Sequence, residues 1–190
     1  MPPGVETTAI PEVRFIRPLV HRDERGWFLE VMRAAELEEL GLTGHFAQVN
    51  QSRSRRGVIR GLHLQWDPPQ AKLMRVVAGR AFLVAVDARP GSPTLGRLVT
   101  LEASADDPVF VSAPASFARG FAALEDDTEV EYFMSAPYDP AHEAVIRWDD
   151  PALGIAWPVD APVLSAKDAS AGTLADWLAR PEASVFAYQR

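Results

Sequence analysis

The stretch Gly57–Gln65, read as GVIRGLHLQ, combines apolar residues typical of a buried β-strand with two side chains that can carry charge. These are Arg60 and His63, and in an apolar strand each needs either polar partners or a function. The strand pattern alone fits a hydrogen-bonded core histidine and a functional histidine equally well. Other parts of the chain must therefore decide between these two interpretations.

Eight further short runs have the same strand character, and turn-forming Gly, Pro, Asp and Ser residues separate them. These runs cover residues 13–20, 46–52, 72–79, 81–88, 96–103, 108–114, 116–124 and 128–135. Helical patterns occur only at residues 34–40 and 173–180, which is too few for a parallel α/β sheet. The sequence predicts a mainly β fold, a sandwich, jelly roll or small barrel, in a single domain over residues 1–190. From Pro151 onward we expect an irregular segment that lies over the barrel.

Composition narrows the possible partners and chemistry. The chain has 190 residues, 47% of them hydrophobic and 24% charged, as in an ordinary soluble domain. Its net charge is −7 and only Arg53, Arg55 and Arg56 cluster, so no nucleic-acid partner is expected. No apolar run is long enough to span a membrane, so no membrane partner is expected. Residues 1–13 lack the pattern of a secretory signal, which favours a cytoplasmic location. The absence of cysteine excludes thiolate catalysis.

A metal site can be tested against the spacing of histidines. A metal-binding jelly-roll barrel usually has two histidines close together on one strand, a carboxylate, and a third histidine on a later strand. Here His63 is followed by Gln65, and the later run 116–124 carries Arg119 in place of a histidine. A guanidinium cannot ligate a metal ion, so no metal is expected.

Lys72 and Tyr132 raise the same question as Arg60, namely whether a polar side chain in a strand has hydrogen-bonding partners or a function. Lys72 begins the otherwise apolar run KLMRVVAG, and Tyr132 lies inside the run TEVEYFMS. A tyrosine in such a run is usually part of the core with a hydrogen-bonded hydroxyl, but it can also donate a proton. Arg25 and Lys167 complete a set of cations that strand and loop geometry could bring together.

At these residues the sequence resembles the dTDP-4-dehydrorhamnose 3,5-epimerase family of the cupin superfamily. The resemblance extends from about residue 14 to about residue 169 and is carried by DERGWFLE (23–30), QVNQSRSRRGVIRGLHLQ (48–65), residues 70–97, FARGFAAL (117–124), residues 137–158 and LSAKD (164–168). It implies a double-stranded β-helix barrel, a homodimer whose N-terminal strands cross to the partner, and no metal or organic cofactor. It also implies the substrate dTDP-4-dehydro-6-deoxy-D-glucose, inverted at C3 and C5 toward dTDP-L-rhamnose.

The resemblance assigns roles to the candidate residues. The ketone at C4 acidifies the protons on C3 and C5, so the site needs a base, an acid on the other face and a cation near the enolate oxygen. The resemblance implies that His63 is the base, with Asp168 as its carboxylate partner. Tyr132 would be the acid and Lys72 the cation. Substrate binding would fall to Arg25, Glu30, Gln48, Asn50, Arg60, Tyr138, Glu143 and Lys167, with Tyr138 stacking on the thymine.

Two positions depart from the family pattern. Arg119 replaces a histidine that helps to hold the substrate, and we expect it to bind a phosphate or sugar oxygen. Phe133 follows Tyr132 where a polar residue is often found. Some relatives in antibiotic deoxysugar pathways invert only C3, so a C3-only epimerase stays open as an alternative. Further alternatives are a catalytically idle sugar-nucleotide binder, a related 3,4-ketoisomerase and a metal-dependent cupin oxygenase.

Overall fold

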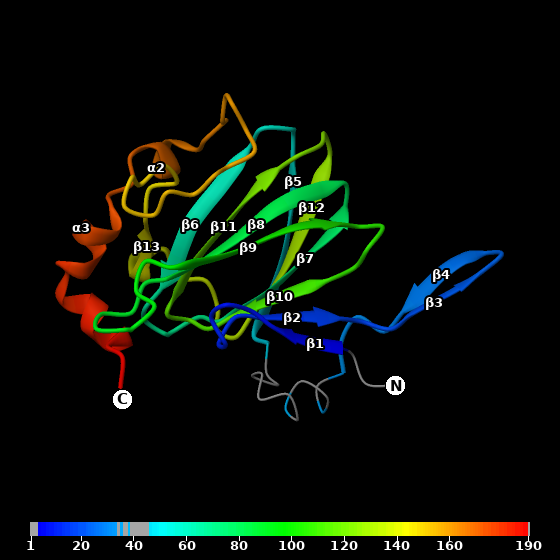
Figure 1. Cartoon of the computed structure of the whole chain (residues 1–190), viewed down its shortest axis with the longest axis horizontal. Helices are drawn as coiled ribbons and strands as arrows, with labels where there is room; N and C mark the ends of the chain where they lie inside the picture. The colour runs from blue at the N-terminus through cyan, green and yellow to red at the C-terminus, as the bar shows by residue number, and fades with distance from the viewer. Residues whose placement is uncertain (1–3, 34, 36–37, 39–45, 190) are drawn as a thin grey trace.

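A computed structural model describes residues 4–33, 35, 38 and 46–189 and shows two antiparallel sheets that face each other (Figure 1). In spatial order the six-stranded sheet contains β1 (Gly4–Thr7), β2 (Arg14–Arg17), β10 (Phe110–Ala113), β7 (Lys72–Ala78), β12 (Thr128–Met134) and β5 (Gln48–Ser54). The five-stranded sheet contains β13 (Glu143–Val145), β6 (Ile59–Gln65), β11 (Phe117–Ala123), β8 (Arg80–Asp87) and β9 (Leu98–Ser104). The expected mainly β barrel is confirmed.

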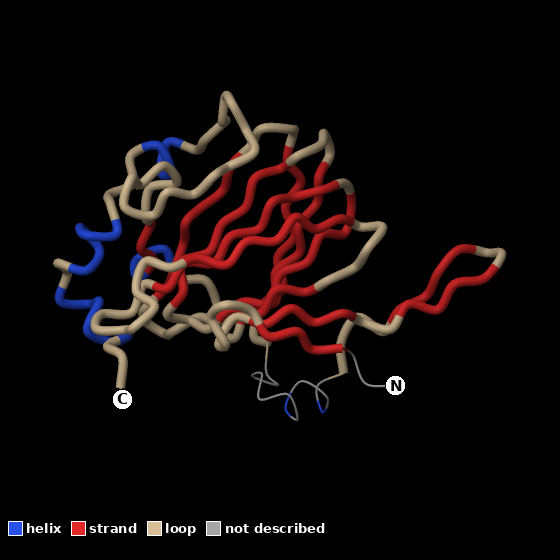
Figure 2. The backbone as a smooth tube through the Cα atoms, viewed as in Figure 1, coloured by secondary structure: helices blue, strands red, loops and turns tan. Residues whose placement is uncertain are grey.

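All nine runs that the sequence predicts as strands form strands. Four strands were not predicted, namely β1, β13 and the two strands of a hairpin, β3 (Val20–Asp23) and β4 (Gly26–Leu29). This hairpin is a separate two-stranded sheet that projects away from the barrel (Figure 2). It is almost entirely exposed on both faces, although β4 carries Trp27 and Phe28, and therefore lacks the polar–apolar alternation that marks a half-buried strand.

The helices are few and short, as predicted. The helix expected over residues 173–180 is α3 (Leu174–Leu178), where Thr173 and Asp176 form a capping box. Before it lies α2 (Ala166–Ala169), and two 3₁₀ turns are also present, η1 (Pro140–His142) and η2 (Pro181–Phe186). Most of the helix expected over residues 34–40 lies outside the described residues. No helix in the described part of the chain is both long and apolar enough to cross a membrane.

Strand alternation divides each sheet into an inner and an outer face. Val76, Leu83, Phe117, Phe121 and Val130 point into the space between the sheets and form one buried core. The outer face of the five-stranded sheet is covered by the segment that follows residue 145, in agreement with the expectation of an irregular cover (Figure 1). Apolar residues in that cover, including Trp157, Leu174, Trp177 and Phe186, pack against outward-facing side chains of β6, β8 and β11.

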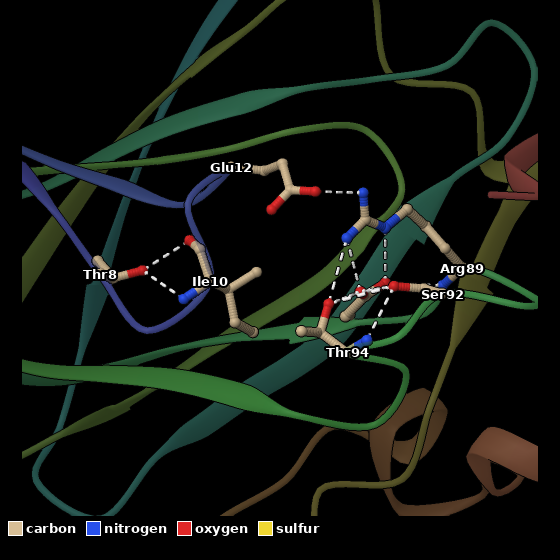
Figure 3. Close-up of polar contacts among 7 residues, drawn as sticks. Thr8, Ile10, Glu12, Arg89, Ser92 and Thr94 are labelled. Carbon is tan, nitrogen blue, oxygen red and sulfur yellow. Dashed lines mark hydrogen bonds and ion pairs between the residues drawn. The ribbon is translucent and has the colours of Figure 1, made fainter. Parts of the chain in front are cut away.

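The loop after β8 carries Arg89, which bonds to Glu12 near the N-terminal end of the described chain (Figure 3) and contacts Tyr188 near the other end. The Arg89 guanidinium donates to Glu12 at 2.7 Å and to the buried Asp87, and it stacks on the rings of Phe117 and Tyr188. Burial alone would raise the pKa of Asp87, but hydrogen bonds from Arg89 and from the nearby Ser92 and Thr94 hydroxyls outweigh it and lower that pKa.

The position of Arg60 and His63 depends on a close approach between β6 and β11. Gly61 has φ +124°, and a Cβ built on it would lie 2.5 Å from the Gly120 Cα and 2.8 Å from the Arg119 carbonyl oxygen. The pairing of the two strands shifts register between Arg119 and Phe121, beside this contact. Only glycine fits both the backbone angle and the available space.

We expect Gly61→Ala to lower the free energy of unfolding by more than about 3 kcal/mol, because it adds a backbone clash to the torsional strain. Gly26 is a matched control, since it has φ +127° but nothing within 4 Å of a built Cβ. Gly26→Ala should cost only the strain, about 1–2 kcal/mol. Urea unfolding at pH 7 measures both values, and equal losses would contradict the role assigned to the close approach.

Candidate active site

The polar candidates gather around a cavity of about 480 Å³ between the two sheets. Inward-facing side chains of β6 and β11 line it on one side, and those of β5, β7 and β12 line it on the other. They include His63, Arg119, Lys72 and Tyr132. These residues share the barrel interior with the apolar core, so one part of that interior is packed and another part forms a cavity with polar side chains in its wall.

His63 is held in place by a carboxylate from outside the barrel strands. Its Nε2 lies 2.6 Å from Asp168 Oδ1. Asp168 is in turn fixed by Ser165, the N-cap of α2, which donates to Asp168 Oδ2 at 2.8 Å. Burial raises the pKa of the Asp168 carboxyl, but the hydrogen bonds from His63 and Ser165 outweigh burial and hold it below its usual value. The pair can orient the imidazole and stabilise an imidazolium.

A second cluster lies at the rim beside His63. The other ring nitrogen, Nδ1, is 3.6 Å from Glu143 Oε1 on β13. The second oxygen of Glu143 accepts from Lys167 Nζ at 2.5 Å and from the Tyr138 hydroxyl at 3.1 Å. Desolvation lowers the pKa of Lys167, yet the bond to Glu143 more than offsets it and the pKa is raised. Tyr138 is largely exposed, so its ring is free to stack on a flat ligand.

Tyr132 faces the same cavity from the sheet opposite His63. Its hydroxyl lies 2.8 Å from the Ser52 hydroxyl on the neighbouring strand β5. Burial raises the pKa of Tyr132 to about 12, while the Ser52 hydrogen bond and the charge of Arg60 oppose that rise. The phenol is therefore protonated at neutral pH and can donate a proton from the face opposite the imidazole.

Two cations in the cavity wall, Lys72 and Arg119, have no carboxylate within ion-pair distance among the described residues. In the described residues Lys72 makes neither a side-chain hydrogen bond nor an ion pair, and burial followed by the charge of Arg119 lowers its pKa to about 7. Arg119 is 3% exposed, and its Nη1 donates to the carbonyl oxygens of Gln70 and Pro114, both at 3.0 Å. Burial lowers the pKa of Arg119 to about 9, so it stays charged at neutral pH.

The remaining expected binding residues divide into two groups. Arg60 and Asn50 line the cavity, and Arg60 Nε donates to Ser54 at 3.1 Å. Gln48 is not part of the cavity lining. Its side chain bonds to Asn50 and to the backbone of Tyr138, which both line the cavity.

Arg25 and Glu30 are not brought to the cavity of their own chain. Arg25 lies in the turn of the β3–β4 hairpin and pairs with Asp23, and Glu30 follows that hairpin. Among the described residues, no cluster of three or more histidine or carboxylate side chains is arranged to hold a metal ion.

Three serines that support the site were not predicted from the sequence: Ser52, Ser54 and Ser165. Ser165 could have been found, because Ser-x-x-Asp is the signature of a helix N-cap. Ser52 and Ser54 gave no such signal. The role of Ser52 depends on the register of β5 against β12, and the role of Ser54 depends on the approach of β6 after the turn that follows β5. Residues 52–54 reveal neither by themselves.

Comparison with known proteins identifies a close family. A family model described as dTDP-4-dehydrorhamnose 3,5-epimerase matches residues 7–176. A Neisseria gonorrhoeae protein of that name is 44% identical over 169 residues, which are 88% of this chain and 52% of the relative, so the chain spans about half that protein's length.

Solved structures agree with this. The Legionella pneumophila epimerase in complex with dTDP-4-keto-L-rhamnose has a TM-score of 0.94 at 40% identity and covers 99% of this chain and 100% of its own. A Streptomyces bikiniensis 3'-monoepimerase in complex with dTDP-quinovose has a TM-score of 0.84 at 38% identity, covering 90% of this chain and 87% of its own.

The contact between Asp168 and His63 predicts a pH-dependent contribution to stability. The carboxyl has a lower pKa in the folded chain than its reference value of 3.8, so it stabilises the fold above that value and loses this effect as pH falls through the folded pKa. Asp168→Asn should lower the free energy of unfolding by about 1–2 kcal/mol at pH 7 and by progressively less below about pH 4.

Urea unfolding at several pH values measures this effect. Asp149→Asn serves as the control, because Asp149 also has a pKa lowered by an arginine but lies at the surface, where an ion pair contributes little. A loss for Asp168→Asn that stays constant down to pH 3 would show that the carboxylate charge is not its source.

Proposed function

The chain belongs to the dTDP-4-dehydrorhamnose 3,5-epimerase family, and from this membership we propose that it is an isomerase that epimerises a dTDP-4-keto-6-deoxyhexose beside its ketone. The proposed substrate is dTDP-4-dehydro-6-deoxy-D-glucose. One observation carries the proposal: His63, paired with Asp168, and Tyr132 face one cavity from opposite sheets, and Lys72 lines the same cavity from the strand next to that of Tyr132. The roles of the single residues are likewise proposed.

The cavity contains the three groups that enolisation and reprotonation need, which are a base, a cation and an acid. In a D-gluco ring the hydrogens on C3 and C5 are both axial and lie on the same face, so one base can reach both. His63 removes a hydrogen from that face, and Lys72 stabilises the negative oxygen at C4. Tyr132, protonated at neutral pH, returns a proton from the other face and so inverts the carbon. Asp168 stabilises the imidazolium that forms.

The nucleotide half of the substrate is assigned to the rim. Tyr138 is the exposed ring for the thymine, and Lys167, fixed by Glu143, and Arg60 are cations for the diphosphate. Asn50, backed by Gln48, contributes polar groups at the β5 side of the cavity.

The proposal is tested by following deuterium from solvent into the sugar by NMR. The wild-type enzyme should incorporate deuterium at C3 and C5 with inversion at both carbons. In Tyr132→Phe the base is intact, so exchange should continue on the face of His63 while inversion falls by about 10²–10⁴-fold. His63→Ala should lose exchange altogether.

Tyr188→Phe is the control, because Tyr188 lies on the surface and stacks on Arg89, outside the cavity. It should exchange and invert like the wild type. Absence of deuterium at both carbons in the folded wild-type protein would overturn the proposed function, and full exchange in His63→Ala would overturn the role of the base.

A C3-only epimerase is the second candidate. It is favoured by Arg119, which stands where the family has a histidine, and by the likeness to the Streptomyces bikiniensis 3'-monoepimerase. The same measurement separates the two functions, since a C3-only enzyme would invert C3 and leave the configuration at C5 unchanged.

We further propose that the enzyme is a homodimer in which the β3–β4 hairpin of each chain completes the cavity of its partner. The hairpin extends away from its own barrel (Figure 2). The side chains of Trp27 and Phe28 on it are 54% and 68% exposed. Apolar side chains this exposed on a projecting arm favour contact with another surface. Arg25 and Glu30, which lie outside the cavity of their own chain, would then contact the substrate of the partner.

Mixing two inactive variants tests this arrangement. The Arg25→Ala and His63→Ala homodimers should each have little or no activity, and exchange of subunits should restore about a quarter of wild-type activity. Half of the dimers are then mixed, and each mixed dimer has one intact site. If Arg25 serves its own chain, every site of a mixed dimer carries one defect and no activity returns. Sedimentation of the unmixed proteins checks that they are dimers.

A further inference from the structure

Two positive side chains meet in the cavity wall from facing sheets. Lys72 begins β7, and Arg119 lies in the middle of β11, where its Cα is paired with that of His63. Both line the cavity. In the described part of the chain neither has a carboxylate within ion-pair distance, although like charges in a buried wall repel each other. Such an arrangement costs folding free energy, so its presence at the candidate site points to a use.

Arg119 is held in the cavity wall by hydrogen bonds to the backbone, and it carries a positive charge there. Its Nη1 is anchored on the backbone carbonyl oxygens of Gln70, Pro114 and Ala113 at 3.0, 3.0 and 3.4 Å. Its Nε and Nη2 are the buried side-chain nitrogens of the described residues that have no hydrogen-bond partner. Because these two nitrogens are closed off from solvent, a ligand in the cavity would experience the charge of Arg119 but would not contact its N–H groups.

The charged groups that act on Lys72 lie on several of the elements that surround the cavity. Arg119 on β11 and Lys167 on α2 repel its proton, and Glu143 on β13 attracts it. Glu143 is already shared with Lys167 and faces His63 on β6. Tyr132 on β12 stays neutral at neutral pH, and Arg60 is engaged with Ser54. Burial and Arg119 therefore outweigh Glu143, and the pKa of Lys72 is lowered to about 7.

We propose that Arg119 is a positioning residue that acts through Lys72: its fixed charge makes Lys72 the group that gives a proton to the ketone oxygen and takes it back. This inference rests on the proposed function. Lys72 is then an acid and base in the reaction as well as a cation near the oxygen, and the intermediate is a neutral enol. Arg119 supplies the permanent positive charge that Lys72 loses when its proton moves.

In the proposed reaction each proton has a donor and an acceptor among these residues or in solvent. His63 takes the hydrogen from carbon, the C–H electrons form the C=C bond, and the carbonyl oxygen accepts a proton from Lys72 Nζ. Neutral enol, neutral amine and imidazolium result. The amine then removes the enol proton, the carbonyl re-forms, and the C=C electrons take a proton from Tyr132 on the other face. Imidazolium and phenolate are reset by exchange with solvent.

The test compares Arg119→Gln with Arg119→Lys. In the wild type the rate should fall as Lys72 deprotonates, so the alkaline limb of kcat against pH lies near 7. Arg119→Gln removes the repelling charge and should move that limb upward by about one pH unit or more. Arg119→Lys keeps the charge, and the limb should stay near its wild-type position. A limb that does not move in Arg119→Gln would overturn the inference.

A second measurement does not depend on turnover. NMR titration of the lysine side chains, with Lys72→Met to assign the signal, should give a Lys72 pKa near 7 in the wild type and a higher one in Arg119→Gln. Arg75→Gln is the control, because Arg75 lies on the outer face of the same strand and pairs with Glu131. It should leave the Lys72 titration unchanged.

The two measurements separate the possible failures. A Lys72 that titrates above pH 9 in the wild type, or that titrates identically in Arg119→Gln, overturns the coupling between the two cations. A shifted Lys72 in a protein that exchanges no deuterium would retain the coupling and overturn the proposed function. If Arg119→Gln does not fold, Arg119→Met removes the same charge and is used in its place.

Discussion

The period-two alternation of side chains in two facing sheets is the constraint on which this structure depends. It requires every second residue of β5, β6, β7, β11 and β12 to point into one shared interior. In part of that interior the inward positions are apolar and close the core, as at Val76, Phe117 and Val130. In the rest they are Lys72, Arg119, Tyr132 and His63, and the same geometry produces a cavity.

The facing sheets also separate the groups that must act on opposite sides of a ligand. His63 belongs to the five-stranded sheet and Tyr132 to the six-stranded sheet, so neither can approach the face served by the other. Each shares a hydrogen bond with a residue that is itself placed by secondary structure: His63 with the carboxylate of Asp168 in α2, and Tyr132 with Ser52 in β5. Orientation of the reacting groups is therefore a property of the barrel and is present before a ligand binds.

The fold was largely predictable from the sequence and the site only partly. Nine strands with strand-like sequence and clear turns between them were found, whereas the β3–β4 hairpin is almost entirely exposed and has no buried face to reveal it. Strand pattern singled out Arg60, His63, Lys72 and Tyr132. It could not pair His63 with Asp168, which is 105 residues away in the sequence and reaches the site on a short helix. That pairing, like Tyr138 and Glu143, came from the family resemblance.

Arg89, which follows β8, couples the two ends of the described chain during local unfolding. Arg89 contacts Glu12 near one end of the chain and Tyr188 near the other, and it lies over Phe117, the first residue of β11. Loss of either terminal segment would expose the Arg89 guanidinium and the ring of Phe117 beneath it. The other terminal segment depends on that same guanidinium for its contact with the barrel. The two ends should accordingly detach together, so that proteolytic trimming at one end weakens the protection of the other.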